Sequence, residues 1–152
     1  MYWIATGLFA TAVVAQANAA ETPANLIDLS AAWTLATSQA RADTPLFMTI
    51  ANRGDAADSL LRARCPPDIA DFTEKHATDR GEGGLAMREV KNFAIPAQGT
   101  VTLAPGGNHL MLLQVREPLT AGRTFTCSIV FQKAGTVTVE VKVAPADAKA
   151  AP

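Results

Sequence analysis

Two histidines and two methionines have side chains that can bind a soft metal ion, and they lie in one spaced set. His76, Met87, His109 and Met111 follow the pattern H-x10-M-x21-H-x-M. In an extended strand, residues two positions apart share a face, so His109 and Met111 are predicted to project to the same side. His76 ends one predicted strand and Met87 lies on the next, so a hairpin between them brings the two together. The pattern indicates a pocket with two imidazole nitrogens and two thioether sulfurs.

This donor set selects among metals. Thioethers are soft, neutral ligands that suit Cu(I), whereas Zn(II) prefers thiolate, imidazole and carboxylate. Ca(II) and Mg(II) require oxygen ligands, which the set lacks. A blue-copper site requires a cysteine thiolate beside its histidines, and Cys127 has no histidine near it in the sequence. The residues therefore favour a protein that carries Cu(I) over one that uses copper for electron transfer.

A purely structural role for these residues is the alternative. Methionine in a β-protein is more often core filler than ligand, and a lone histidine is usually a satisfied core or surface residue. Residue types alone leave both interpretations open.

Charge and motifs exclude several other functions. The chain has 13 Lys and Arg against 14 Asp and Glu, a net charge of −1. This balance argues against the broad basic surface that nucleic-acid binding needs. The sequence contains no G-x-S-x-G, no phosphate-binding glycine loop and no H-E-x-x-H. An enzyme is therefore the weaker class of function.

Residues 1–20 are predicted to be a cleaved signal peptide. They contain no charged side chain, and a short apolar run is followed by Ala17-Asn18-Ala19. Small residues at this place are typical of a secretory cleavage site, here after Ala19 or Ala20. The alternative is an uncleaved membrane anchor, but the run is shorter than the ~20 residues that a spanning helix needs. We therefore expect export with no stable membrane insertion after cleavage.

Export bears on the only two cysteines, Cys65 and Cys127. They are too far apart for a C-x-x-C redox motif or a zinc knuckle. In an oxidising compartment the favoured interpretation is a structural disulfide between them. Two buried free thiols are the alternative.

Alternating apolar and polar residues predict an all-β sandwich. Short strand-like segments recur at regular spacing with turn residues between them, and no long helical period appears. We assign residues 21–143 to a single domain and the Ala/Pro-rich residues 144–152 to a flexible tail. The predicted strands are Leu46–Ala51, Ser59–Ala63, Asp71–His76, Leu85–Val90, Thr100–Leu103, His109–Val115, Phe125–Phe131 and Thr136–Val143.

The H-x10-M-x21-H-x-M spacing resembles the signature of the periplasmic copper chaperone family PCuAC. The likeness extends over nearly the whole mature chain. It includes Trp33, the segment Phe47–Ile50, Asn52-Arg53-Gly54, Asp58, the lead-in Pro105-Gly106-Gly107 before His109, and Pro118-Leu119. The resemblance implies a cupredoxin-like Greek-key β-sandwich with its metal site near one exposed end. It further implies that His76, Met87, His109 and Met111 bind copper, while Met48 is a core residue.

The resemblance also implies a function. Such proteins carry Cu(I) through the periplasm of a Gram-negative-type envelope toward the CuA centre of cytochrome c oxidase, often alongside a Sco-type thiol protein. Some relatives hold a second copper ion in a His/Met-rich C-terminal extension. Residues 144–152 contain neither His nor Met, so one Cu(I) per chain is expected, transferred by ligand exchange. A copper scavenging or tolerance protein and a metal-free envelope interaction module are the alternatives.

The sequence departs from the family pattern at two positions. Leu35 and Ser59 stand where relatives commonly have arginine. We expect neither residue to contact the ligands. These departures are therefore expected to affect the binding of partner proteins at the surface rather than the binding of metal.

Overall fold

The computed structural model describes residues 26–81 and 83–152, so the predicted signal peptide lies outside the described residues. This part of the chain folds into strands without an α-helix, which confirms the predicted all-β class. It accordingly contains no helix long and apolar enough to cross a membrane. The strands are β1 (Ile27–Leu35), β2 (Thr44–Asn52), β3 (Asp58–Arg64), β4 (Ala70–Gly81), β5 (Gly84–Glu89), β6 (Phe93–Ile95), β7 (Thr100–Leu103), β8 (His109–Val115), β9 (Thr124–Phe131) and β10 (Gly135–Ala144).

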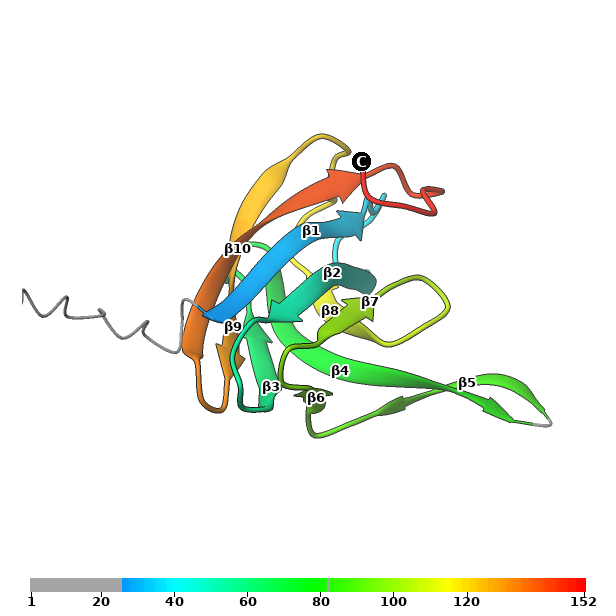
Figure 1. Cartoon of the computed structure of the whole chain (residues 1–152). Helices are drawn as coiled ribbons and strands as arrows, with labels where there is room; N and C mark the ends of the chain where they lie inside the picture. The colour runs from blue at the N-terminus through cyan, green and yellow to red at the C-terminus, as the bar shows by residue number, and fades with distance from the viewer. Residues whose placement is uncertain (1–25, 82) are drawn as a thin grey trace, which may run out of the picture.

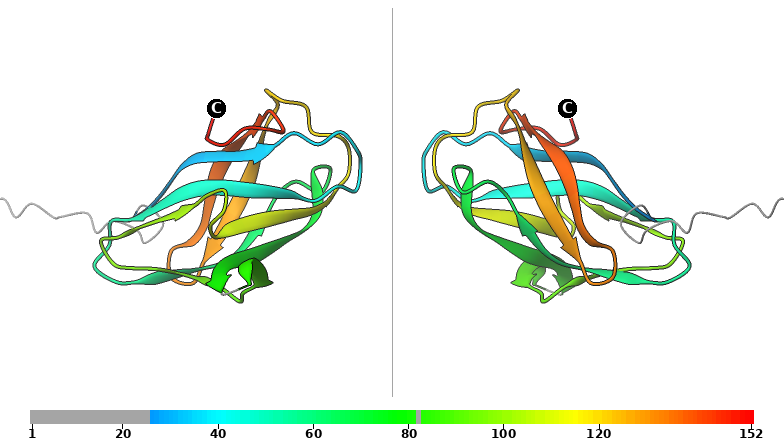
Figure 2. Two further views of the ribbon diagram at one scale, coloured as in Figure 1. Left: turned by 90° about the vertical axis from the view of Figure 1, so that its right-hand side faces the viewer. Right: turned by 90° about the vertical axis from the view of Figure 1, so that its left-hand side faces the viewer.

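The strands form one continuous mixed sheet in the order β5-β4-β8-β2-β1-β10-β9-β3-β6, with β7 also paired to β2. The β1 and β10 strands run parallel, and the other pairs are antiparallel. The sheet bends over on itself, so that β9 and β10 cross behind β1 and β2 in the left view of Figure 2. Side chains from both halves meet in one main core, which is the predicted sandwich.

Alternation along β2 and β8 decides which side chains reach this main core. Leu110 and Leu112 on β8 are fully buried there, and Met48 on β2 is 1% exposed. The residues between them face the other way. We call the side of β2, β4, β5 and β8 that faces away from the main core the outer face. His109 and Phe47 lie on it.

The alternation of apolar and polar residues did not predict two of the strands, β1 and β6. In β1 the register with β2 shifts between Ser30 and Trp33, and Ala31 has a φ of 49°. This bulge interrupts the period of two on which strand prediction depends. The β6 strand has only three residues, too few to show any period.

Cys65 and Cys127 form a disulfide, which confirms that prediction. It joins the end of β3 to the middle of β9, and Arg64 and Ser128 beside it are already paired across these strands. Cys127 is fully buried in the main core. The bridge therefore fixes a pair of strands that carries none of the four candidate ligands.

A second, smaller cluster lies on the outer face. Trp33, Phe47 and Ala144 are buried in it, and Leu35 and Ala148 pack against it. The Ala148 N–H donates to the Pro145 carbonyl at 3.0 Å, which turns the chain back after β10. Residues 145–149, here called the C-terminal segment, thus lie against this outer cluster.

Candidate metal centre

His76 and His109 lie side by side on the outer face. They are direct cross-strand partners in the antiparallel pair of β4 and β8. Their ring centroids are 5.5 Å apart and the ring planes are inclined by 75°. Because directly opposed residues project from the same face, the register alone brings these two imidazoles together.

The two methionines lie on either side of the histidines. Met111 follows His109 by two residues on β8 and is half-buried. Met87 lies on β5 opposite Thr78, one diagonal step from His76, because β4 and β5 form the predicted hairpin. Met87, His109 and Met111 line a common cavity of about 300 Å³. His76 is not among the residues that line this cavity, but its ring packs against that of His109. The structure thus brings all four predicted residues to one region of the outer face.

The four predicted ligands differ in how far their side chains are exposed to solvent. His109 is only 5% exposed, whereas Met87 is 63% exposed. Met87 lies on the β4–β5 hairpin, which projects away from the body of the domain (Figure 1). The site is therefore anchored in the sheet at one histidine and open to solvent at one thioether.

Hydrogen bonding sets the tautomer of His109. Its Nδ1 lies 2.9 Å from the Gly107 carbonyl oxygen, and a carbonyl only accepts, so Nδ1 carries the hydrogen. In the neutral ring this leaves the lone pair on Nε2. The same carbonyl accepts a hydrogen bond from the Thr78 hydroxyl at 2.8 Å, so the acceptor itself is held in place from β4.

His76 has the opposite tautomer. Its Nε2 lies 2.9 Å from the Glu74 carboxylate, which accepts the Nε2 hydrogen. Its Nδ1 is buried and has no hydrogen-bond partner in the described part of the chain. Leaving such an atom unpaired costs about 1–3 kcal/mol. A bound metal ion would satisfy this lone pair, so the ring fits the donor set that the sequence predicts.

The loop before β8 fixes the position of His109. Gly106 has a φ of 72°, a left-handed conformation that glycine adopts without strain. The Gly107 N–H donates to the Ala104 carbonyl at 3.0 Å and closes the turn. Asn108 accepts a hydrogen bond from the Thr78 backbone N–H at 3.2 Å. The Pro-Gly-Gly lead-in is therefore tied to β4, the strand that carries His76.

Aromatic rings support His109 from behind. The Phe47 and His109 ring centroids are 6.2 Å apart in an edge-on arrangement, and Trp33 lies 4.7 Å from Phe47. This row of rings joins the outer cluster to the site. It limits the directions in which the His109 ring can turn.

Several residues at the site were not singled out in the sequence. Glu74 could have been found, because it stands two residues before His76 and so shares its face. Lys149 and Ala148 of the C-terminal segment also line the 300 Å³ cavity, but no periodicity predicts where a segment after the last strand will lie. Leu35 lines the same cavity, so this departure from the family pattern falls inside the candidate site.

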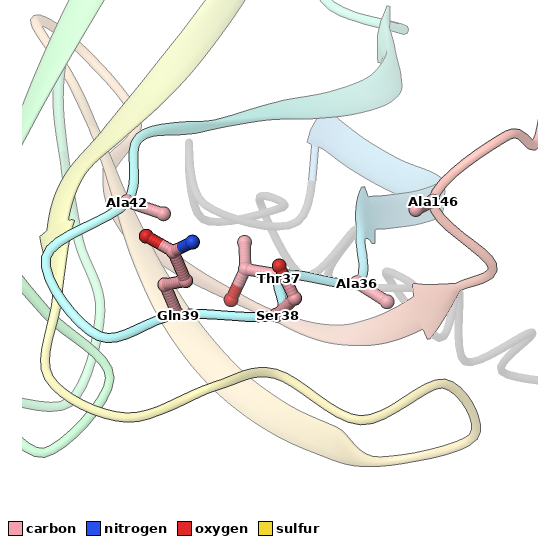
Figure 3. Close-up of a pocket in the computed structure, with 6 residues that line it drawn as sticks. All are labelled: Ala36, Thr37, Ser38, Gln39, Ala42 and Ala146. Carbon is pink, nitrogen blue, oxygen red and sulfur yellow. The ribbon is translucent and has the colours of Figure 1, made fainter.

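A second cavity lies beside the first and shares the C-terminal segment as a wall. It has a volume of about 400 Å³ and is lined by Ala36, Thr37, Ser38, Gln39, Ala42 and Ala146 (Figure 3). These described residues include no histidine, methionine, cysteine or charged side chain. Of the four predicted ligands, Met87, His109 and Met111 line the first cavity and none lines the second.

Comparison with known sequences identifies related proteins. Residues 27–143 match the protein family described as "Putative lipoprotein LpqE-like". The "Putative lipoprotein Lxx21020" of Leifsonia xyli subsp. xyli (strain CTCB07) is 33% identical over 144 residues, which cover 92% of this chain and 84% of that protein.

Solved structures share the fold. The copper-bound PCuAC domain from PmoF2 has a TM-score of 0.66 at 24% identity and covers 79% of this chain and 93% of that domain. The solution structure of CuI-DR1885 from Deinococcus radiodurans has a TM-score of 0.58 at 27% identity and covers 76% of this chain and 78% of that one. The fold is that of a PCuAC domain, as the sequence resemblance predicted.

Proposed function

The chain belongs to the LpqE-like family, with the fold of PCuAC copper chaperones, and on this premise we propose that it carries one Cu(I) ion. His76, Met87, His109 and Met111 are the proposed ligands. The observation that carries the proposal is the buried Nδ1 of His76 beside His109, which has no hydrogen-bond partner among residues 26–81 and 83–152. Both thioethers line the adjoining cavity, and soft neutral sulfur is a donor that Cu(I) accepts well.

The proposed mechanism is transfer by ligand exchange. Four neutral donors leave the single positive charge of Cu(I) uncompensated, which favours attack by an incoming anionic ligand. Met87 is the proposed first ligand to leave, because its side chain is 63% exposed while His109 is held in the sheet. The histidines keep the ion bound while the acceptor replaces the thioethers. The protein acts as a carrier rather than an enzyme.

The proposed setting is the oxidising space outside the cytoplasmic membrane, the periplasm in a Gram-negative-type envelope. The Cys65–Cys127 disulfide supports export, and the relative from Leifsonia xyli is described as a lipoprotein. The proposed acceptors are the copper-bearing subunit of cytochrome c oxidase, at its CuA centre, and a Sco-type copper protein.

An anaerobic competition titration tests the proposal. The chain without its predicted signal peptide is titrated with Cu(I) against a coloured chelator, with Zn(II) and Cu(II) in parallel. We expect one equivalent of Cu(I) to bind tightly and Zn(II) to bind weakly, since thioethers discriminate against Zn(II). Folded protein that takes up no Cu(I) would contradict the proposal and favour a metal-free envelope interaction module.

Glu74 is expected to raise Cu(I) affinity by orienting His76. Glu74→Ala removes the acceptor that holds the hydrogen on Nε2 and so releases the ring from the tautomer with a free Nδ1. Loss of such a supporting partner weakens metal binding by about 10–100-fold. Because the Glu74 side chain is 37% exposed, we expect the lower end of this range, measured by the same titration. Glu74→Gln keeps an acceptor oxygen and is expected to lose less.

Glu89 supplies the matched control for that prediction. It lies opposite His76 on β5 and is exposed. Its carboxylate makes no hydrogen bond to His76 in the described part of the chain. Glu89→Ala therefore removes the same charge without freeing the ring. Equal losses of affinity in Glu74→Ala and Glu89→Ala would mean that only the local charge matters.

A further inference from the structure

The C-terminal segment places one positive charge at the proposed copper site. Of the described residues that line the 300 Å³ cavity, Lys149 is the one with a formally charged side chain. It makes no salt bridge within the described chain, and it is exposed. Ala148 beside it packs against the outer cluster, so the segment is held where its lysine reaches the cavity that Met87 and Met111 share.

Apart from Lys149 and His109, the side chains that line the cavity are apolar. Leu35, Pro45 and Phe47 line it together with the two methionines. The nearest carboxylate to the histidines, Glu74, is engaged with His76 Nε2 and is not part of this wall. Because Lys149 is exposed, the attraction of its ammonium group for an incoming anion is that of a charge near the protein surface.

The volume also limits what enters. At about 300 Å³ the cavity is roughly ten times the share of one water molecule in the liquid. It accommodates a side chain together with the peptide units that carry it. Copper(I) selects a soft donor atom and Lys149 selects a negative charge, and the cysteine thiolate is the protein side chain that combines both properties.

We infer that this cavity receives a cysteine thiolate of the acceptor protein, and that Lys149 attracts and orients that thiolate as it replaces Met87 on copper. The inference rests on the proposed function. In the step, the bond between copper and the Met87 sulfur breaks and a bond between copper and the cysteine sulfur forms. Copper remains Cu(I), Met87 leaves as a neutral thioether, and a thiol that arrives protonated releases its proton to water. Lys149 is a positioning residue and not a copper ligand.

Transfer kinetics test this role. Cu(I)-loaded protein is mixed with a peptide that carries two cysteines, and the transfer rate is compared with that to a neutral methionine-rich peptide. We expect Lys149→Glu to slow transfer to the cysteine peptide by about tenfold, since the reversed charge repels a thiolate. The rate to the methionine-rich peptide is expected to change less than about twofold, and Lys149→Arg is expected to transfer like the unaltered chain.

Lys142→Glu is the matched control, because Lys142 is an exposed lysine that lines a different cavity with Glu140. It makes the same change in net charge and is expected to leave both rates unchanged. The inference would be overturned if Lys149→Glu did not slow Cu(I) transfer to the cysteine peptide. It would also be overturned if Lys142→Glu slowed that transfer as much, or if Lys149→Glu slowed transfer to both peptides equally. A Lys149→Glu effect seen with glutathione and not with the cysteine peptide would overturn the assignment to a protein acceptor.

The two proposals fail in different ways. Cu(I) uptake by the unaltered chain is measured before any transfer experiment. If it binds no Cu(I), the proposed function fails. If it binds Cu(I) and Lys149→Glu transfers as fast to the cysteine peptide, only the role of Lys149 fails.

Discussion

Replacing His109 and Met111 together with alanine is expected to lower Cu(I) affinity by well over ~100-fold, more than the loss typical of a supporting residue. The double variant removes the imidazole that is held in place by Gly107 and Phe47 and the half-buried thioether two residues later. His76 and Met87 then remain as two ligands on neighbouring strands. The measurement is the anaerobic Cu(I) competition titration. Unchanged affinity in a folded double variant would refute the site assignment.

Two further variants separate ligand loss from loss of structure. His109 is 5% exposed, so its removal leaves space beside Phe47 and lowers stability. Met87→Ala alters a side chain that is 63% exposed, and is expected to weaken Cu(I) binding with no change in Tm. Met48→Leu is the matched control, because it removes a thioether buried in the main core with little change of volume. We expect Met48→Leu to bind Cu(I) as tightly as the unaltered chain.

Removal of the disulfide is expected to have the largest effect on stability. Cys65 and Cys127 are 62 positions apart, and closing a loop of that length lowers the entropy of the unfolded chain by an amount worth about 4 kcal/mol. The Cys65→Ala/Cys127→Ala variant is expected to lose about this much free energy of unfolding and to melt about 12 °C lower. Thermal and urea unfolding followed by circular dichroism measure both quantities.

The same variant distinguishes stability from metal binding. The disulfide joins β3 and β9, and the proposed ligands lie on β4, β5 and β8. Well below its melting temperature, the variant is therefore expected to bind Cu(I) as the unaltered chain does. Reduction of the unaltered chain by dithiothreitol should reproduce the loss of stability. A Tm within about 2 °C of the unaltered value would mean that the bridge adds little beyond the packing of Cys127.

Local patterns in the sequence predicted the parts of the site that depend on one strand or one hairpin. Alternation placed His109 and Met111 on one face, and the glycine-rich turn placed Met87 on the strand that follows His76. The direct pairing of His76 with His109 could not be predicted in this way. It requires β4 to lie beside β8, and three other strands separate these two along the chain. The alternation of residues along one strand carries no information about which distant strand lies beside it.

The unpredicted parts of the fold have equally definite causes. The strand Ile27–Leu35 was not predicted, because the bulge at Ala31 interrupts the alternation of apolar and polar residues along it. The placement of Lys149 follows from the packing of Ala148 on Trp33, Phe47 and Ala144, three residues that are distant from one another in sequence. Composition describes residues 144–152 only as Ala/Pro-rich and cannot specify a surface on which they lie.

The parallel pairing of β1 with β10 has a consequence for the order in which the molecule is assembled. The first strand is completed by the last, so the sheet cannot close until the chain through the end of β10 is free to fold. Contacts between such distant segments form late and slowly. The C-terminal segment that lines the cavity follows β10 directly, so the cavity also forms only after β10 has been synthesised and has paired with β1. Under the proposed function, a chain that has not yet folded lacks a finished site, so it binds Cu(I) only after the domain is complete.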